Sequence, residues 1–242
     1  VPPAPPAGEM PILEIGILGP MRSMSGTAYS NTGQIAEEEI NEAGGVNVGG
    51  KFYKLEVVAI DDNCILSVTD AVAAVEKAIV VDKIRFFVGT ARSEAALAQQ
   101  EVCMDHKCIF GISSMSPKIC DRLVEDYDRY KYSFRGMLDS VETGKSIWAS
   151  VDMIANALRR ELGIEKPRVA GIAEKALFAD PAAAYLPKVA DALGLEFVGN
   201  WRPSPNASDV AAELSAIKDA GAQILVTFDN GPVASVIGKQ WG

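Results

Sequence analysis

The sequence has little of what most enzymes depend on. It contains one histidine, His106, and four cysteines among 242 residues, with no Cys-x-x-Cys pair or Cys/His spacing typical of zinc. It has no G-x-x-x-x-G-K-[ST] phosphate loop, and the turn at residues 16–20 lacks the third glycine of a dinucleotide fingerprint. His106 lies in an Asp-His-Lys turn, away from the expected cleft. We therefore expect no enzyme activity, no cofactor and no metal.

The sequence also lacks an excess of basic residues and any long apolar run. Lys and Arg number 23 against 32 Asp and Glu, which gives a net charge of -9. This sign repels phosphate backbones and anionic headgroups, so we expect no nucleic-acid partner. No apolar run approaches the ~18 residues that a membrane span needs.

The few cysteines leave their pairing open. Four cysteines permit two disulfides in three arrangements, but their density is far below that of a disulfide scaffold. Cys103 lies near the end of a predicted helix and Cys108 in the following strand. This spacing allows a disulfide across the turn, and it equally allows two separately buried thiols.

The sequence does contain a regular alternation of short apolar runs and longer segments of helical period. Within the latter, apolar residues recur as in Ala36, Ile40 and Ala43 ahead of Gly44-Gly45, which predicts helices. Strands alternating with helices pair in parallel, because each helix returns the chain over a sheet face. We therefore predict an α/β fold with two Rossmann-like lobes, each a parallel sheet flanked by helices. The predicted strands are residues 12–18, 55–60, 85–88, 108–112, 168–172, 195–198 and 223–228.

Changes in the pattern divide the chain into three parts. Residues 1–10 form a proline-rich stretch, typical either of a tether or of a frayed terminus. Residues 11–135 form the first predicted lobe, with a charged loop over residues 121–131. Residues 136–242 form the second predicted lobe.

Candidate site residues follow the strands, because ligands of such sheets bind beyond the carboxyl ends of the strands. Residues 89–94 combine a glycine, two hydroxyls and Arg92 at the start of a helix, where free backbone N–H groups favour an anion such as a carboxylate. An ordinary Ser93 cap with Arg92 in solvent is the alternative. Other strand-end candidates are Ser113, Ser114, Met115, Phe178 and Asp229.

Two adjacent carboxylates, Asp61 and Asp62, also end a predicted strand. Such a pair can share a proton or a cation. Alternatively, Asp62 and Asn63 end the strand and cap the next helix.

Residues 33–45, which end in Ile-Asn-x-x-Gly-Gly, and residues 55–63, which end in Asp-Asp-Asn, carry a family resemblance. They resemble the first helix and second strand of the leucine/isoleucine/valine-type substrate-binding proteins of ABC transporters. The resemblance continues through Phe134-Arg135 to residues 220–226, and it implies the type I periplasmic-binding fold. Members of that family are longer, so we expect a C-terminally truncated chain with an incomplete first lobe.

The resemblance also implies ligand contacts. It matches Ser93 to a residue that binds the ligand α-carboxylate, and Ser113, Ser114 and Met115 to residues at the ligand head group. It matches Phe178 to an aromatic residue of the second lobe that closes over the ligand.

Other positions distinguish this chain within the family pattern. Tyr29 matches an aromatic residue of the first-lobe loop at residues 20–29, and that loop carries an additional Arg22. Arg92 stands where amino-acid binders carry a cysteine that pairs with the one matched by Cys64. Met115 replaces a hydroxyl. An added cation near the carboxylate pocket suggests an aromatic acid, dicarboxylate or amide rather than a simple branched-chain amino acid.

The function that the resemblance implies is non-catalytic binding. We expect the extracytoplasmic substrate-binding component of an ABC importer, located in the periplasm or outside the cell, that closes on an amino acid or related small carboxylate or amide. Its expected partners are this ligand and a membrane permease. A ligand-sensing regulatory domain of the same fold is the alternative.

Overall fold

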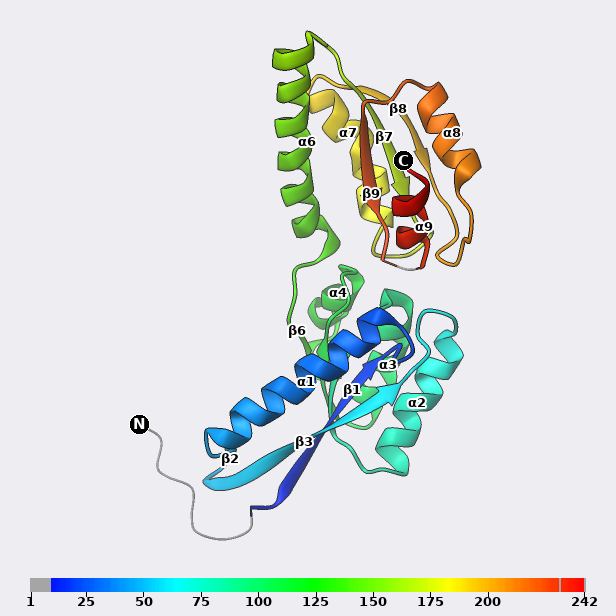
Figure 1. Cartoon of the computed structure of the whole chain (residues 1–242). Helices are drawn as coiled ribbons and strands as arrows, with labels where there is room; N and C mark the ends of the chain where they lie inside the picture. Colours follow the sequence, from blue (N-terminus) through cyan, green and yellow to red (C-terminus); the bar gives the residue numbers. More distant parts are fainter. Residues whose placement is uncertain (1–9, 231, 242) are drawn as a thin grey trace. The chain divides into compact units, whose positions relative to one another are not determined.

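Two compact units make up the chain (Figure 1). The computed structural model describes residues 10–230 and 232–241. Unit 1 comprises residues 10–114 and 118–137, and unit 2 comprises residues 115–117, 138–230 and 232–241. The predicted proline-rich tether therefore lies, except for Met10, outside the described residues.

Unit 1 contains a six-stranded sheet with the order β2-β3-β1-β4-β5-β6. All neighbouring strands pair in parallel except β2 and β3, which form an antiparallel hairpin. The expectation of purely parallel pairing is wrong at this edge because Gly49 and Gly50 adopt positive φ values of 60° and 90° and close a tight turn. The strands are β1 (Ile12–Gly19), β2 (Val46–Val48), β3 (Lys51–Asp61), β4 (Phe86–Gly89), β5 (Ile109–Ile112) and β6 (Ser133–Arg135).

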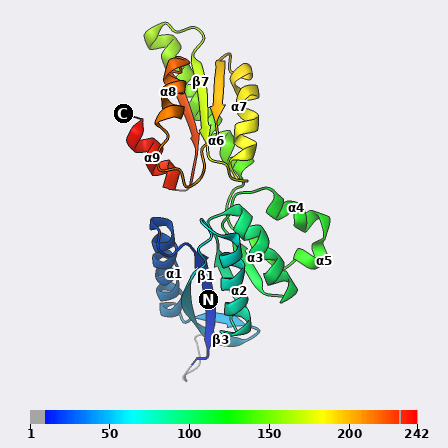
Figure 2. The same cartoon turned by 90° about the vertical axis from the view of Figure 1, so that its right-hand side faces the viewer.

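Helices cover both faces of this sheet. Figure 2 shows α1 (Met24–Glu42) on one side of β1, and α2 (Val68–Val80) and α3 (Ser93–Asp105) on the other. Helix α1 begins at Met24, inside the segment 20–29 that was expected to be a loop, because the Ser23 side chain accepts a hydrogen bond from the Gly26 N–H and caps it.

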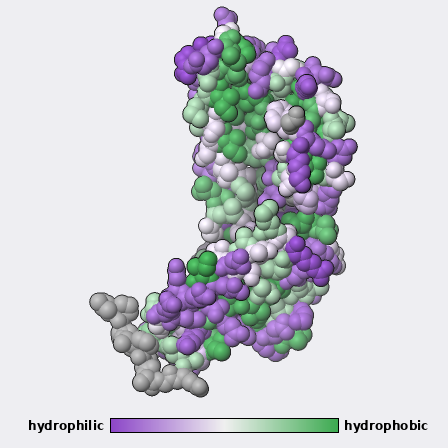
Figure 3. All heavy atoms as spheres, viewed as in Figure 1, coloured by the Kyte–Doolittle hydropathy of each residue, from purple (hydrophilic) through white to green (hydrophobic). Residues whose placement is uncertain are grey.

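The predicted apolar face of α1 is not the face through which the helix contacts the sheet. Ala36 and Ala43 are exposed, and Figure 3 shows predominantly hydrophilic residues over the C-terminal part of α1. Polar side chains hold the inner face instead. Asn41 donates to the Leu55 carbonyl at 2.9 Å and accepts from the Leu55 N–H at 2.8 Å, and Glu37 accepts from the Val57 N–H at 2.7 Å. Helix α1 therefore satisfies backbone groups of β3 that no strand pairs.

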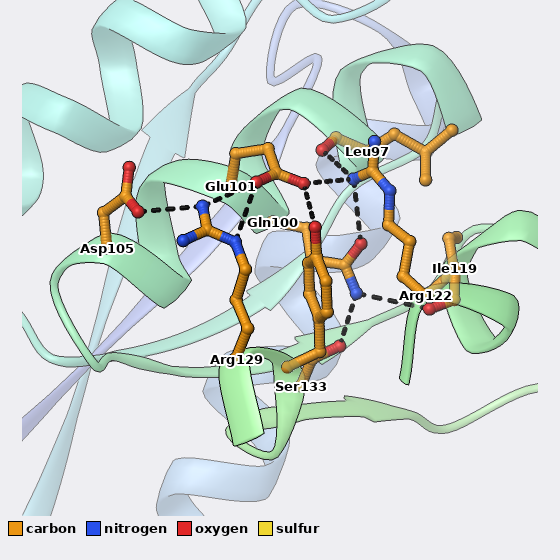
Figure 4. Close-up of polar contacts among 9 residues, drawn as sticks. Leu97, Gln100, Glu101, Asp105, Ile119, Arg122, Arg129 and Ser133 are labelled. Atoms are coloured by element: carbon orange, nitrogen blue, oxygen red, sulfur yellow. Dashed lines mark hydrogen bonds and ion pairs between the residues drawn. The ribbon is translucent and has the colours of Figure 1, made fainter. Parts of the chain in front are cut away.

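The segment predicted as a charged loop over residues 121–131 is mostly helical. It forms α4 (Lys118–Glu125) and α5 (Tyr127–Tyr130), and Figure 4 shows their arginines bound to α3. Arg122 donates to the Leu97 carbonyl at 2.7 Å, and Arg129 lies 2.7 Å from a Glu101 carboxylate oxygen. Burial raises the pKa of Glu101, but hydrogen bonds from Tyr130 and Arg129 outweigh it, so that the pKa lies below its ordinary value. The charged residues of this segment therefore hold α4 and α5 against α3.

Unit 2 contains a three-stranded parallel sheet with the order β8-β7-β9. One apolar cluster packs α6 and α7 on one face of β7, and a second packs α8 and α9 on the other (Figure 2). Gly163, with a φ of 66°, ends α6 as predicted. The elements are α6 (Ser140–Leu162), β7 (Arg168–Ala173), α7 (Asp180–Ala192), β8 (Glu196–Trp201), α8 (Ala211–Asp219), β9 (Ile224–Phe228) and α9 (Pro232–Gln240).

Candidate functional site

The strand order places a topological switch point in each unit. In unit 1 the chain passes from β1 to β3 on one side and then to β4 on the other, so the winding reverses between β1 and β4. In unit 2 it reverses between β7 and β9. Ligands of doubly wound sheets bind at the carboxyl ends of such strands. The loops after β1, β4, β7 and β9 are therefore the candidate site segments.

A glycine at the end of β4 sets the first of these loops. Gly89 has a φ of 142°, and a Cβ atom placed on it would lie 2.1 Å from the Leu18 carbonyl oxygen. Only glycine fits this approach without a shift of the backbone. The loop after β4 thereby begins directly against β1.

A buried aspartate holds the same loop from beneath. Asp62 is wholly buried, and its Oδ2 atom accepts from the Thr90 hydroxyl at 2.5 Å and from Gln99 Nε2 at 3.0 Å. Its Oδ1 atom accepts from the Cys64 N–H at 3.1 Å. Three donors therefore satisfy this carboxylate, which ties the end of β3, the loop after β4 and α3 together.

The two adjacent aspartates do not act as a pair, and Asp62 does not cap the next helix. Asp61 lies 3.1 Å from Arg22 Nε and accepts from the Met21 N–H at 3.2 Å, so it holds the loop after β1. The cap of α2 is Ser67. Asp61 ends β3 and Asp62 follows it, and their carboxylates have different partners: Asp61 contacts Arg22, and Asp62 contacts Thr90 and Gln99.

Ser93 is the first residue of α3 and is 1% exposed. Arg92, not Ser93, occupies the cap position, without a side-chain cap bond. Arg92 does not extend into solvent: it donates to the Ile65 carbonyl at 2.8 Å and to Glu94 at 3.1 Å. The alternative of a Ser93 cap beside a solvated arginine is therefore wrong.

Further hydroxyls gather around the Thr90 carbonyl. Ser113 Oγ lies 3.2 Å from that oxygen, and Ser114 Oγ donates to it at 2.5 Å. The hydroxyl of Tyr29, on α1, lies 3.5 Å from Ser113 Oγ. The structure therefore brings Tyr29, Ser113 and Ser114 together beside the loop that carries Ser93.

In unit 2 two carboxyl groups meet at the switch point. Asp229 Oδ1 accepts from the Glu174 N–H at 2.9 Å, and Glu174 accepts from the Asn230 N–H at 3.2 Å. The buried Asp229 Oδ2 has no hydrogen-bond partner within the described part of the chain. Burial, and then the charge of Glu174, raise the pKa of Asp229 to about 7.

Arg202 crosses the end of β7 beside this pair. It donates to the Ala173 carbonyl at 2.8 Å, to the Glu174 carbonyl at 2.9 Å and to Asp180 at 2.6 Å. The guanidinium therefore fixes the start of the loop that contains Phe178.

Phe178 and Met115 belong to one apolar cluster of unit 2. Phe178 is 9% exposed, and Met115 packs against the cluster that contains it. The Met115 carbonyl accepts from the Ser140 N–H at 2.9 Å. In this structure Phe178 packs under its loop.

Sequence reasoning missed Gln99, Glu174 and Arg202. Glu174 directly follows β7, so its position after a strand could have identified it. Gln99 and Arg202 carry no comparable signal, because their contacts join segments 37 and 22 residues apart.

Within the described ranges no group of three or more His, Cys, Asp or Glu residues is placed to hold a metal ion. None of the helices in those ranges is long and apolar enough to cross a membrane.

Two doubly wound units with polar loops at their switch points define an α/β protein built like small-molecule binders. Residues 13–241 match the family described as periplasmic binding protein, and the chain belongs to this family. The predicted resemblance and fold class are thereby confirmed. No curated protein matches the chain.

Several solved structures share the fold. A solute-binding protein of an ABC transporter from R. palustris, in complex with 4-hydroxybenzoate, is 18% identical with a TM-score of 0.73. One from Rhodopseudomonas palustris BisB5, in complex with 3,4-dihydroxybenzoic acid, is 22% identical with a TM-score of 0.67. A third, from R. palustris in complex with benzoate, is 17% identical with a TM-score of 0.72. The alignments cover 95% of this chain and 57%, 58% and 59% of those chains.

Proposed function

We propose that the chain binds a small aromatic carboxylate as part of an extracytoplasmic solute-binding protein that delivers its ligand to an ABC permease. The residues 11–135 and 136–242 serve as its two lobes. The proposal contains no catalytic step.

The arrangement at the unit 1 switch point supports this proposal most strongly. The α3 N-terminus, with Ser93, lies beside the hydroxyls of Tyr29, Ser113 and Ser114. The backbone N–H groups and dipole of a helix N-terminus favour a carboxylate, and the Tyr29 hydroxyl can donate a further hydrogen bond to it.

The choice of an aromatic acid over an amino acid draws on unit 2 and on the similar structures. An ammonium group favours an ionised carboxylate, and burial and Glu174 raise the pKa of Asp229 to about 7, so that this carboxyl is about half protonated at neutral pH. A protonated Asp229 donates a hydrogen bond, which suits a phenolic or carboxylate oxygen. The similar proteins named above bind benzoate and its hydroxylated forms.

The remaining site residues enter the proposal with different roles. Met115 supplies an apolar contact for the aromatic ring, and Phe178, packed under its loop, supports that contact from the same apolar cluster. Arg22 and Arg92 are not assigned a direct ligand contact, because each already forms an ion pair, Arg22 with Asp61 and Arg92 with Glu94.

A thermal-shift screen tests the function. Benzoate, 4-hydroxybenzoate, leucine and benzamide are compared at equal concentration, because benzamide keeps the ring and removes the carboxylate charge. Ligand at 100 times its dissociation constant stabilises by about 2.7 kcal/mol, which gives a measurable shift. The proposal predicts a shift with the two acids alone, and a shift with leucine alone would contradict it.

Calorimetric titration of variants then tests the site. Ser93→Ala is expected to weaken binding of the effective acid about tenfold, because one hydrogen bond to a charged group is lost. Ser215→Ala, on the exposed surface of α8, serves as the matched control. Equal affinity of the two variants for the acid would show that the Ser93 side chain does not bind the ligand.

A further inference from the structure

The end of α3 places two cysteines side by side. Lys107 has a positive φ of 54°, the Lys107 N–H donates to the Met104 carbonyl at 3.1 Å, and the Cys108 N–H donates to the Cys103 carbonyl at 2.8 Å. These two bonds form the Schellman motif, in which the side chains at the positions of Cys103 and Cys108 commonly touch.

The hydrogen bond limits the distance between the two residues. Standard backbone dimensions and a 2.8 Å bond restrict the separation of the two Cα atoms to at most about 6.7 Å. Disulfides span Cα separations of roughly 4.4 to 6.8 Å. The Cα separation of this pair therefore does not exceed the distance that a disulfide can span.

Both sulfurs also lie in one environment. Cys103 and Cys108 are each 0% exposed, and burial, followed by the nearby Cys108, raises the pKa of Cys103 above its ordinary value. Arg85 Nη1 lies 3.7 Å from Cys108 Sγ, and Cys108 Sγ lies 3.8 Å from the His106 carbonyl oxygen.

We infer that Cys103 and Cys108 form a disulfide that joins the C-terminal end of α3 to the start of β5. In the structure described here all four cysteines are thiols. Cys64 and Cys120 lie on other segments, and neither shares such a turn.

The oxidant is a disulfide donor, either a protein disulfide or oxidised glutathione. The Cys108 thiolate attacks the donor, forms a mixed disulfide and releases one donor thiolate. Cys103 then loses its proton and attacks Cys108 Sγ, which forms the new bond and releases the second donor thiol. Two protein thiols are thus oxidised by two electrons, and the donor disulfide is reduced to two thiols. Because both sulfurs are buried, exchange requires folding or local opening of the turn.

The supply of this donor in the cell rests on the proposed extracytoplasmic location. The chemistry of the pair is independent of that location and of ligand binding. A test on the purified chain therefore separates a failure of this inference from a failure of the proposed function.

Tryptic mapping without reductant gives a direct test. The chain is refolded with oxidised and reduced glutathione, and free thiols are then alkylated. Trypsin cleaves after Lys107 and leaves the four cysteines in separate peptides, residues 55–77, 93–107, 108–118 and 119–122. The expected result is a covalent link between peptides 93–107 and 108–118. Recovery of both peptides alkylated and unlinked, or a link of either to another cysteine peptide, would overturn the inference.

The unfolding temperature provides the second measurement. Reductant is expected to lower the unfolding temperature of the wild type and of Cys120→Ala by roughly 4 °C, because the loop constraint is lost. Reductant should not change that temperature in Cys103→Ala. This comparison within each variant cancels the cost of the substitution itself, and equal sensitivity of all three proteins would contradict the disulfide.

Discussion

Single polar residues decide how unit 1 is assembled. The predicted apolar side of α1 faces outward at Ala36 and Ala43, and Asn41 and Glu37 contact the backbone of β3 instead. The Ile-Asn-x-x-Gly-Gly ending of α1 thus has a structural reason, since Asn41 matches both the N–H and the carbonyl of Leu55.

Asn41→Ala should destabilise unit 1 by about 2 kcal/mol, because two hydrogen bonds are lost and the Leu55 backbone groups are left unpaired. Urea unfolding followed by circular dichroism measures the change. Asn31→Ala, at an exposed position of the same helix, is the matched control and should change the stability by less than about 0.5 kcal/mol.

Asp229 makes unit 2 sensitive to pH. Its folded pKa of about 7 exceeds the ordinary value of 3.8. A raised carboxyl pKa means that folding favours the protonated form, so its contribution to stability is complete below about pH 4 and is lost as the pH rises toward 7. Urea midpoints of the wild type should therefore fall over this range relative to those of Asp229→Asn.

Two features keep this measurement specific. Glu101 in unit 1 has a lowered pKa, so its contribution to the pH dependence of stability has the opposite sign. Tryptophan fluorescence avoids this contribution, because Trp148, Trp201 and Trp241 all lie in unit 2. Asp191→Asn, on the exposed side of α7, is the control. A wild-type profile that parallels that of Asp229→Asn would refute the assignment.

At the scale of elements, the loop after β4 depends on one close approach. Gly89→Ala places a Cβ atom 2.1 Å from the Leu18 carbonyl oxygen in a backbone conformation unfavourable to alanine. We expect it to destabilise unit 1 by about 3 kcal/mol or more and to weaken ligand binding.

Gly136→Ala provides the comparison, because a Cβ atom there meets nothing within 4 Å. Circular dichroism in urea measures stability, and titration with the ligand identified in the screen measures affinity. Two variants of equal stability would show that the backbone of this loop can adjust.

The order and type of most elements could be predicted from the sequence, because apolar period and glycine stops act locally. The predicted strands 12–18, 168–172 and 223–228 correspond to β1, β7 and β9, with each bound within one residue of the prediction. The hairpin strand β2 was missed because its three residues, Val-Asn-Val, are too few to establish an alternating period. Helices α4 and α5 were missed because Arg122 and Arg129 are stabilised by α3, and such distant contacts leave no local pattern.

The site was less accessible to prediction for the same reason. Strand ends identified the loops that contain Ser93, Ser113 and Asp229. The residues that hold those loops, such as Gln99 and Arg202, reach across the fold from other elements. Periodicity reports which way a residue faces, but not which distant backbone atom it meets.

At the scale of the whole molecule, the two units have separate apolar clusters. Those of unit 2 are built from α6 to α9 and its own three strands, and unit 1 has a cluster around Cys64 and Ala95. We therefore expect a substitution in the core of one unit to change the stability of that unit alone, because residues without shared partners usually contribute independently to stability.

The tryptophans allow this independence to be measured. Trp148 packs on Phe228 with ring centroids 5.7 Å apart, and Trp201 packs on the cluster formed with α8 and α9. Tryptophan fluorescence therefore reports unit 2, whereas far-ultraviolet circular dichroism reports the helices of both units.

We expect Asn41→Ala to lower the urea midpoint seen by circular dichroism and to leave the fluorescence midpoint unchanged. Leu186→Ala, at a site that is 2% exposed in the unit 2 core, should lower the fluorescence midpoint, because truncation of a buried leucine costs about 2 to 5 kcal/mol. Equal shifts of both signals in both variants would mean that the chain unfolds as one cooperative body. The two units would then be distinct in space but would unfold in a single cooperative transition.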